Sequence, residues 1–274
     1  MYSGSTFTVS SGRLLGAHQK IDRVSRRHLE RLAPGCRFPS IKNILHFEGH
    51  KGPDAIKRKS PAKNEPWHYF QPFEEDDDQL LELISDHYKQ LVTCLASDDQ
   101  VRAAFEAAWL AHAIVDGLTP AHHFPYEEKL VELRSGKGIE TRNTIKKKLV
   151  LPGLSRRNQL HNNWQMWGPK GLFTTHSAFE MGVATLIAPL ALGGAIPSHE
   201  DIEQLARTDI KSWFKQAAQD IAKLKIYDRF YNRGWTVPLA YLVQHKLVPD
   251  ITRAVTVVWF GAAREAGVLS SSKK

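Results

Sequence analysis

Residues 107–123 read AAWLAHAIVDGLTPAHH, and this stretch decides both the fold class and the candidate site. His112 and Asp116 lie four positions apart, so a helix places the imidazole and the carboxylate side by side on one face. Gly117 and Pro120 are expected to end that helix. Because the neighbouring residues are apolar, we expect this face to be buried, where an unpaired charge is costly and a bound metal ion offsets the cost.

Helical periodicity extends from this stretch in both directions. Apolar residues recur at helical spacing over residues 18–32, 101–117, 175–192, 199–225 and 249–266, and a further helix is expected after the acidic cluster at 74–78. Residues 33–75 are rich in Pro, Gly and Lys and predict a long structured loop. The alternation typical of strands is scarce, so the sequence predicts an all-α fold.

The expected architecture is a single multi-helix domain over residues 18–268, with the metal cluster in the interior of the bundle. We expect about seven to nine helices, because one continuous core must gather candidate ligands that are widely scattered along the chain. Residues 1–17 are expected to form an N-terminal extension and residues 269–274 a frayed tail.

Composition limits the class of protein and of partner. The 274 residues include 37 Lys and Arg against 29 Asp and Glu, a surplus that favours phosphate-bearing ligands, nucleic acid or an anionic membrane. A solvated basic surface without a partner is the alternative. Cys36 and Cys94 imply no disulfide framework, although a single bridge stays open. No secretory signal or transmembrane stretch is evident, so we expect a cytoplasmic protein.

Other histidines and carboxylates repeat the pattern of the opening stretch. His176 and Glu180, in THSAFEMG, are again four residues apart on a predicted helix, and His122 lies two residues after Pro120. Each pair alone is more often a surface pair or a core histidine than a metal site. Together they supply imidazole and carboxylate groups, which are common zinc ligands.

The order and spacing of these residues resemble those of the zinc-dependent phospholipase C family and the related single-strand-specific zinc nucleases. The core of the resemblance is His-x-x-x-Asp followed by Pro-x-His, which His112, Asp116 and His122 match. The family's downstream His-x-x-x-Glu/Asp pair matches His176 and Glu180.

The resemblance also extends upstream, to about residue 18. The family has an Asp followed about fourteen residues later by a His within an aromatic segment, and Asp54 of HKGPD and His68 of PWHYFQP fit. A histidine that opens the first helix is also expected, and His18 fits. The resemblance implies a zinc-dependent hydrolase of phosphate esters.

The resemblance further implies which residues hold each metal ion. One zinc would be held by Asp54, His68, His112 and Asp116. A second would be held by His122, His176 and Glu180, with open positions for water and substrate. A third would be bound by His18, with Asp116 bridging. The family carboxylate that Asp54 matches is thought to orient or deprotonate the attacking water, and the alternative for Asp54 is a plain ligand role.

The chain departs from the family at the third metal. Family members bind this ion with the free amine and carbonyl of an N-terminal tryptophan, whereas here Met1 begins the sequence and seventeen residues precede His18. We therefore expect two tightly bound zinc ions and a third that is absent or more weakly held. Water, Asp22 or a group from residues 1–17 could substitute for the lost ligands.

The sequence leaves the substrate open between a phospholipid, a nucleic acid and a small phosphoester. The basic segment that contains Trp164 and Trp167 could favour stacked bases, although such tryptophans are more often packing residues. No obligate protein partner is implied.

Two other classes of helical metalloenzyme are excluded. A metal phosphohydrolase of the HD type needs an adjacent His-Asp pair, and a ferritin-like di-iron oxidase needs paired Glu-x-x-His motifs, and both are missing. A non-catalytic helical protein stabilised by metal remains the alternative.

Overall fold

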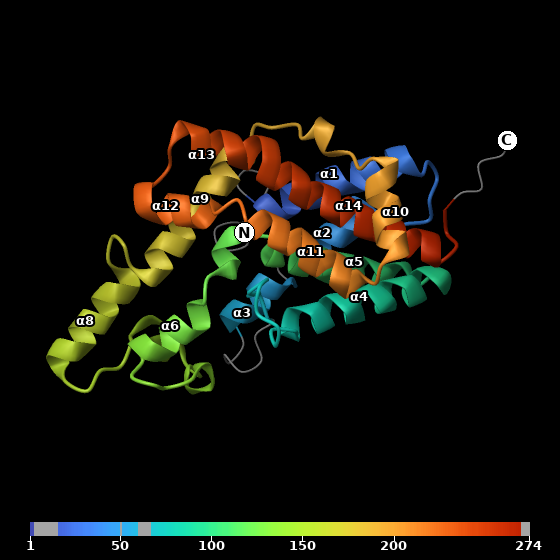
Figure 1. Ribbon diagram of the computed structural model, residues 1–274. Coiled ribbons are helices and arrows are strands. Elements are labelled where there is room, and N and C mark those ends of the chain that lie inside the picture. Colours follow the sequence, from blue (N-terminus) through green and yellow to red (C-terminus); the bar gives the residue numbers. More distant parts are fainter. Residues whose placement is uncertain (3–15, 50, 60–66, 270–274) are drawn as a thin grey trace.

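The computed structural model describes residues 1–2, 16–49, 51–59 and 67–269, and this part of the chain is helical, without a strand (Figure 1). The predicted all-α fold is confirmed. Most of the expected N-terminal extension, residues 3–15, and residues 270–274 of the expected tail lie outside the described residues.

The described residues form more helices, and shorter ones, than the seven to nine expected. Asp209 accepts hydrogen bonds from the backbone N–H groups of Lys211 and Ser212 and starts a new helix where one continuous helix was predicted. Two short helices also form within the segment expected to be a loop. The helices are α1 Ala17–Leu32, α2 Ile41–Glu48, α3 Pro53–Lys59, α4 Gln79–Ala96, α5 Gln100–Gly117, α6 Tyr126–Leu133, α7 Ile145–Leu149, α8 Arg156–Trp167, α9 Leu172–Ile187, α10 His199–Arg207, α11 Ile210–Ala222, α12 Ile226–Arg233, α13 Val237–Leu242 and α14 Val248–Glu265.

Helix α5 is the centre of the fold. It packs against α1, α2, α4 and α14, and thirteen of its eighteen residues are buried. A helix that is covered on all sides must be apolar around its whole circumference, which explains its many alanines. The expected burial of His112 and Asp116 is confirmed, since each is 2% exposed. The central helix therefore carries two candidate ligands into the interior.

Gly117 allows the end of α5 to pack closely against its neighbours. A Cβ atom at this position would lie 2.5 Å from side-chain carbons of Leu80 and of Phe214. The chain then turns through a short 3-10 helix, Pro120–His123. This turn brings His122 back beside the end of α5.

Helices α6, α7 and α8 form a projection from the main bundle, drawn in green to yellow at the lower left of Figure 1. The projection has a small core of its own, made of Tyr126, Leu130, Leu151 and Met166. We refer to residues 134–170 of this part as the basic projection.

Elsewhere, Cys36 and Cys94 are buried free thiols. None of the described helices is long and apolar enough to cross a membrane.

Candidate metal centre

The structure brings all eight predicted site residues into one cluster. The ring centroids of His18 and His112 lie 4.1 Å apart, and those of His68 and His112 lie 5.3 Å apart. The ring of His122 lies 6.4 Å from that of His68 and 5.1 Å from that of His176. The carboxylates of Asp54, Asp116 and Glu180 each lie beside at least one of these rings.

Five separate elements contribute to the cluster. Helix α1 contributes His18 from its first turn, α3 contributes Asp54, α5 contributes His112 and Asp116, the 3-10 turn contributes His122, and α9 contributes His176 and Glu180. His68 lies in the segment before α4 and is clamped to the turn. The backbone N–H of Phe70 donates to the carbonyl of His122, and the Nδ1–H of His122 donates to the carbonyl of His68 at 2.7 Å.

Asp116 is the shared carboxylate at the middle of the cluster. Its Oδ2 lies 2.6 Å from Nδ1 of His68 and 3.1 Å from Nε2 of His112. Its Oδ1 lies 3.1 Å from Nε2 of His18 and 2.6 Å from the amine of Met1. Burial alone would raise the pKa of Asp116, but the amine and the surrounding histidines outweigh it and hold the pKa well below its ordinary value. Asp116 is therefore a charged carboxylate that can bridge neighbouring cations.

Three groups within the cluster have the composition and spacing of metal sites. His18, Glu48 and His112 form one group. Asp54, His68 and His112 form the second, and His122, His176 and Glu180 form the third. Within each group the nitrogen and oxygen donor atoms lie within 4.8 Å of one another. Two ligands of a tetrahedral zinc ion lie about 3.4 Å apart, because each is about 2.1 Å from the metal. The donor atoms of each group therefore lie close enough together to hold a metal ion.

In the third group, the imidazoles already point at one carboxylate oxygen. Nε2 of His122 lies 2.8 Å and Nε2 of His176 lies 3.1 Å from Oε1 of Glu180. Burial would raise the pKa of Glu180, but the Met1 amine and His176 outweigh it and keep the pKa well below its ordinary value. Burial lowers the pKa of His176, which favours the neutral imidazole that a metal requires.

Met1 contributes a terminal amine and a carbonyl group beside the cluster. The amine nitrogen of Met1 lies 2.6 Å from Asp116 and 3.3 Å from Glu180, and its carbonyl oxygen lies 2.7 Å from Nε2 of His18. Of the alternatives for the lost ligands, a group from residues 1–17 is therefore the one that lies next to His18. Burial lowers the pKa of this amine, yet the two carboxylates outweigh burial and raise the pKa to about 10.

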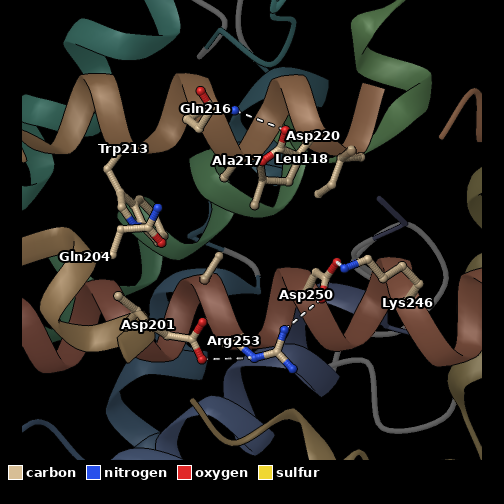
Figure 2. A pocket seen from close by; sticks show the side chains of 13 residues that line it. Leu118, Asp201, Gln204, Trp213, Gln216, Ala217, Asp220, Lys246, Asp250 and Arg253 are labelled. Carbon is tan, nitrogen blue, oxygen red and sulfur yellow. Dashed lines mark hydrogen bonds and ion pairs between the residues drawn. The ribbon is translucent and has the colours of Figure 1, made fainter. Parts of the chain in front are cut away.

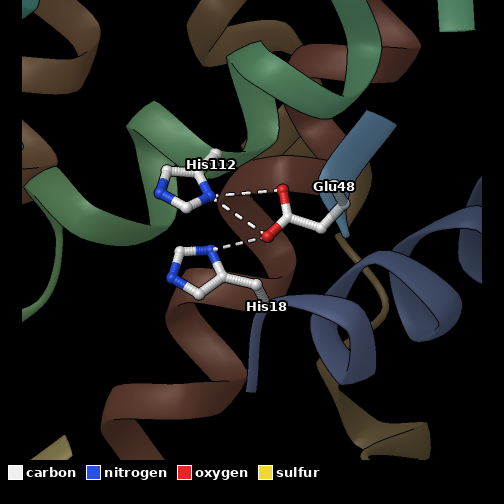
Figure 3. Close-up of side chains that lie close together, drawn as sticks. All are labelled: His18, Glu48 and His112. Atoms are coloured by element: carbon white, nitrogen blue, oxygen red, sulfur yellow. Dashed lines mark hydrogen bonds and ion pairs between the residues drawn. The ribbon is translucent and has the colours of Figure 1, made fainter. Parts of the chain in front are cut away.

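Glu48 completes the cluster and was missed in the sequence. It is fully buried at the end of α2, and its carboxylate lies 3.1 Å and 3.2 Å from Nδ1 of His112 (Figure 3). Nδ1 of His18 lies 3.8 Å from the same carboxylate, and the two rings are stacked with an interplanar angle of 17°. Both rings thus turn Nδ1 towards Glu48 and Nε2 towards Asp116.

The position of Glu48 depends on a close contact between α2 and the turn that follows it. A Cβ atom at Gly52 would lie 2.1 Å from the carbonyl oxygen of Glu48, so a side chain there would force the two segments apart. Asp22, the side chain considered as a substitute ligand, is buried nearby. Burial, and then the charge of Glu48, raise its pKa well above the ordinary value.

A pocket with aromatic and acidic walls adjoins the cluster. Its aromatic residues include Tyr69, whose ring centroid lies 5.3 Å from that of His122 and 6.3 Å from that of His176. Tyr126 stacks on Tyr69 with centroids 5.2 Å apart. The other residues that line the pocket are Trp67, Gln71, Glu74, Asp76, Asp77, Phe124, Pro125, Glu127 and Glu128. We refer to this cavity as the acidic pocket.

A different pocket lies between α10, α11 and α14 and shares no residue with the cluster (Figure 2). Four of its charged side chains are paired with one another. Arg253 contacts Asp250 at 2.8 Å and Asp201 at 3.6 Å, and Lys246 contacts Asp250 at 2.9 Å. These internal pairs satisfy the charges of the pocket wall, so the metal centre is the better candidate for a functional site.

A scan against protein-family models found no match, and searches of curated proteins and of solved structures found none either.

Proposed function

We propose that this protein is a zinc-dependent hydrolase of phosphate esters. One observation carries the proposal: two groups of three donor residues lie side by side, and the charged carboxylate of Asp116 lies next to a histidine of each group. Oδ2 of Asp116 lies 3.1 Å from His112 of one group, and Oδ1 lies 3.8 Å from His122 of the other. Adjacent divalent cations suit displacement at phosphorus, because together they neutralise charge on the attacking and leaving oxygens.

The contacts support the ligand sets that the family resemblance implies. Asp54, His68, His112 and Asp116 would hold one zinc ion. His122, His176 and Glu180 would hold the second. The amine and carbonyl of Met1 support a third set, together with His18 and Asp116. Bound zinc would polarise the phosphoryl oxygens and lower the pKa of water towards about 7.

Asp54 is the proposed group that orients or deprotonates the attacking water. It is the most exposed of the three carboxylates, with 28% of its side chain accessible, against 2% for Asp116 and 16% for Glu180. Burial raises its pKa, but His112 and His68 outweigh burial and lower the net pKa. A charged carboxylate that solvent can reach is able to hold a water molecule and accept its proton.

The acidic pocket supports a particular class of phosphate ester. Glu74, Asp76, Asp77, Glu127 and Glu128 would repel the successive phosphates of a nucleic acid strand. The same carboxylates, together with the rings of Tyr69 and Tyr126, suit a cationic group, because aromatic faces attract ammonium ions. We therefore favour a phosphodiester that carries a positively charged amine or quaternary ammonium group.

The test compares two chromogenic phosphodiesters that release the same nitrophenol, one with a choline substituent and one with a neutral alkyl group. We expect chelator-treated protein to be inactive, zinc to restore hydrolysis, and kcat/KM to be higher for the choline ester. Glu127→Gln combined with Glu128→Gln should remove that preference while leaving the neutral ester unaffected. If zinc raises the melting temperature but neither ester is hydrolysed, the metal is only structural and the proposal fails.

A further inference from the structure

The positive charge of this chain is concentrated in the basic projection. Residues 134–170 contain nine Lys and Arg and a single acidic residue, Glu140. The rest of the chain contains 28 basic and 28 acidic residues. The whole formal surplus of +8 therefore belongs to this one segment, and between Arg142 and Lys170 there is no acidic residue at all.

The same projection exposes large apolar side chains. Leu154 is 90% exposed, Leu160 74%, Ile145 72% and Trp164 67%. On α8, Arg157, Leu160 and Trp164 recur at helical spacing, so they share one exposed face. Met166 on the other side of α8 is buried in the core of the projection. The exposed face is thus both cationic and apolar.

Helix α7 is held beside α8 and adds to this surface. The indole N–H of Trp167 donates to the carbonyl oxygen of Leu149 at 2.9 Å, and Asn163 exchanges hydrogen bonds with the backbone of Leu151. Lys146 and Lys147 of α7 are exposed, as are its apolar residues Ile145 and Leu149.

The cations of this surface are available to an outside partner. Within the described part of the chain, Arg156 and Arg157 form no ion pair, and the ammonium group of Lys147 donates only to the uncharged side chain of Asn143, at 2.9 Å. Exposed cations that lack carboxylate partners keep their full attraction for an external anion.

We propose that the basic projection binds the surface of an anionic phospholipid bilayer. Lys146, Lys147, Arg156 and Arg157 would contact lipid phosphates, and Leu160 and Trp164 would enter the boundary between head groups and acyl chains. Cations beside exposed Trp and Leu are the composition that such an interface favours. Aliphatic side chains cannot stack on bases, so a single-stranded nucleic acid fits this surface less well.

The projection is joined closely to the metal centre. Only residues 168–171 separate α8 from α9, which contains His176 in its second turn and Glu180 in its third. A bilayer bound by α8 would bring lipid phosphodiesters towards the cluster. That last step rests on the proposed hydrolase function, whereas binding to the bilayer does not.

The test measures co-sedimentation of the whole chain with vesicles of phosphatidylcholine alone and of phosphatidylcholine mixed with phosphatidylglycerol. We expect binding to the mixed vesicles that weakens with added salt and is the same with zinc and with chelator. Since each cation at the surface contributes roughly fivefold to binding, Arg156→Gln with Arg157→Gln should weaken binding by about 25-fold. Leu160→Ala with Trp164→Ala should weaken it similarly.

Two matched controls separate this surface from general charge and hydrophobicity. Arg27→Gln with Arg31→Gln removes two exposed arginines from α1, and Val101→Ala with Val237→Ala removes two exposed apolar side chains elsewhere. Both controls should bind mixed vesicles like the unmodified chain. The proposal is overturned if no vesicle binding occurs, or if the controls reduce binding as much as the projection variants. It is also overturned if the projection variants instead abolish binding to a single-stranded oligonucleotide or self-association of the chain.

Discussion

Oε1 of Glu48 lies 3.1 Å from Nδ1 of His112, on the side of the ring opposite the atom that faces Asp116. A carboxylate in this position fixes the tautomer of a metal-binding imidazole, because it accepts a hydrogen bond from the N–H of the other ring nitrogen. His18 turns its Nδ1 towards the same carboxylate, at 3.8 Å. The carboxylate of Glu48 therefore faces Nδ1 of two imidazole rings at once.

This relationship predicts that Glu48 controls zinc affinity. Glu48→Gln should weaken zinc binding by about 10-fold to 100-fold, the usual effect of removing a carboxylate behind a metal-binding histidine. Competition with a fluorescent chelator measures the affinity. Glu106→Gln is the matched control, because Glu106 is equally buried and contacts Nδ1 of His87 at 2.6 Å, outside the cluster. Equal losses in both variants would show that Glu48 acts only through stability.

The Met1 contacts predict that a blocked amine affects one metal ion and not the others. Acetylation of the amine removes its charge and its nitrogen lone pair, so a third zinc ion should be lost. Elemental analysis after dialysis against a mild chelator should fall by one equivalent per chain relative to the unmodified protein. An unchanged zinc content after complete acetylation, verified by mass spectrometry, would rule out the amine as a ligand.

Stability of the metal-free protein should depend on pH in two opposite ways. Asp116 and Glu180 have pKa values well below their ordinary 3.8 and 4.5, so their contribution is present above about pH 4.5 and is lost as pH falls through the folded values. Burial lowers the pKa of His112, but Glu48 and Asp116 outweigh burial and raise it well above 6.5. Its contribution is therefore complete below pH 6.5 and is lost as pH rises through the folded value.

The melting temperature of the chelator-treated protein should consequently be highest between about pH 4.5 and 6.5. Zinc binding requires deprotonated imidazoles, so the increase in melting temperature caused by zinc should grow as pH rises above 6.5. Thermal melts with and without zinc across this range measure both effects. A zinc effect that shrinks with rising pH would contradict histidine ligation.

His112→Ala should lower the melting temperature even without metal. The variant leaves the buried carboxylates of Glu48 and Asp116 without their shared imidazole, a loss of the kind that costs about 3–5 kcal/mol. For a chain of this size that corresponds to about 5–15 °C. His161→Ala, at an exposed histidine of α8, is the control and should change the melting temperature little. Similar melting temperatures for both variants would show that His112 has no structural role.

The sequence predicted the centre of the fold because the deciding information there is local. The spacing of His112 and Asp116 within an apolar run indicated a buried helix face, and His176 and Glu180 repeated the same device. The many Pro and Gly residues of 33–75 predict a loop, because the apolar pattern of α2 is too short to indicate a helix among them. Without that helix, the sequence gives no reason to place Glu48 near His112. Its contact with His112 joins residues 64 positions apart.

Met1 could not be placed from the sequence for a related reason. Its contact with Asp116 joins residues 115 positions apart. Hydrophobic periodicity does not predict the position of a terminal amine in the folded protein. The basic projection shows the same limit. The charge surplus of the chain was evident, but its concentration beside exposed Leu160 and Trp164 required knowledge of which side chains are buried.

A zinc titration of the metal-free protein, followed by hydrolysis of the chromogenic choline phosphodiester, tests the central claim most directly. The activity of the unmodified chain should rise from zero and level off once about two or three equivalents are bound. Asp116→Asn, which keeps the shape of the side chain but removes the bridging charge, should bind less zinc and stay inactive. Full activity of the metal-free chain, or unchanged turnover and zinc content in Asp116→Asn, would contradict the assignment of this cluster as a catalytic zinc centre.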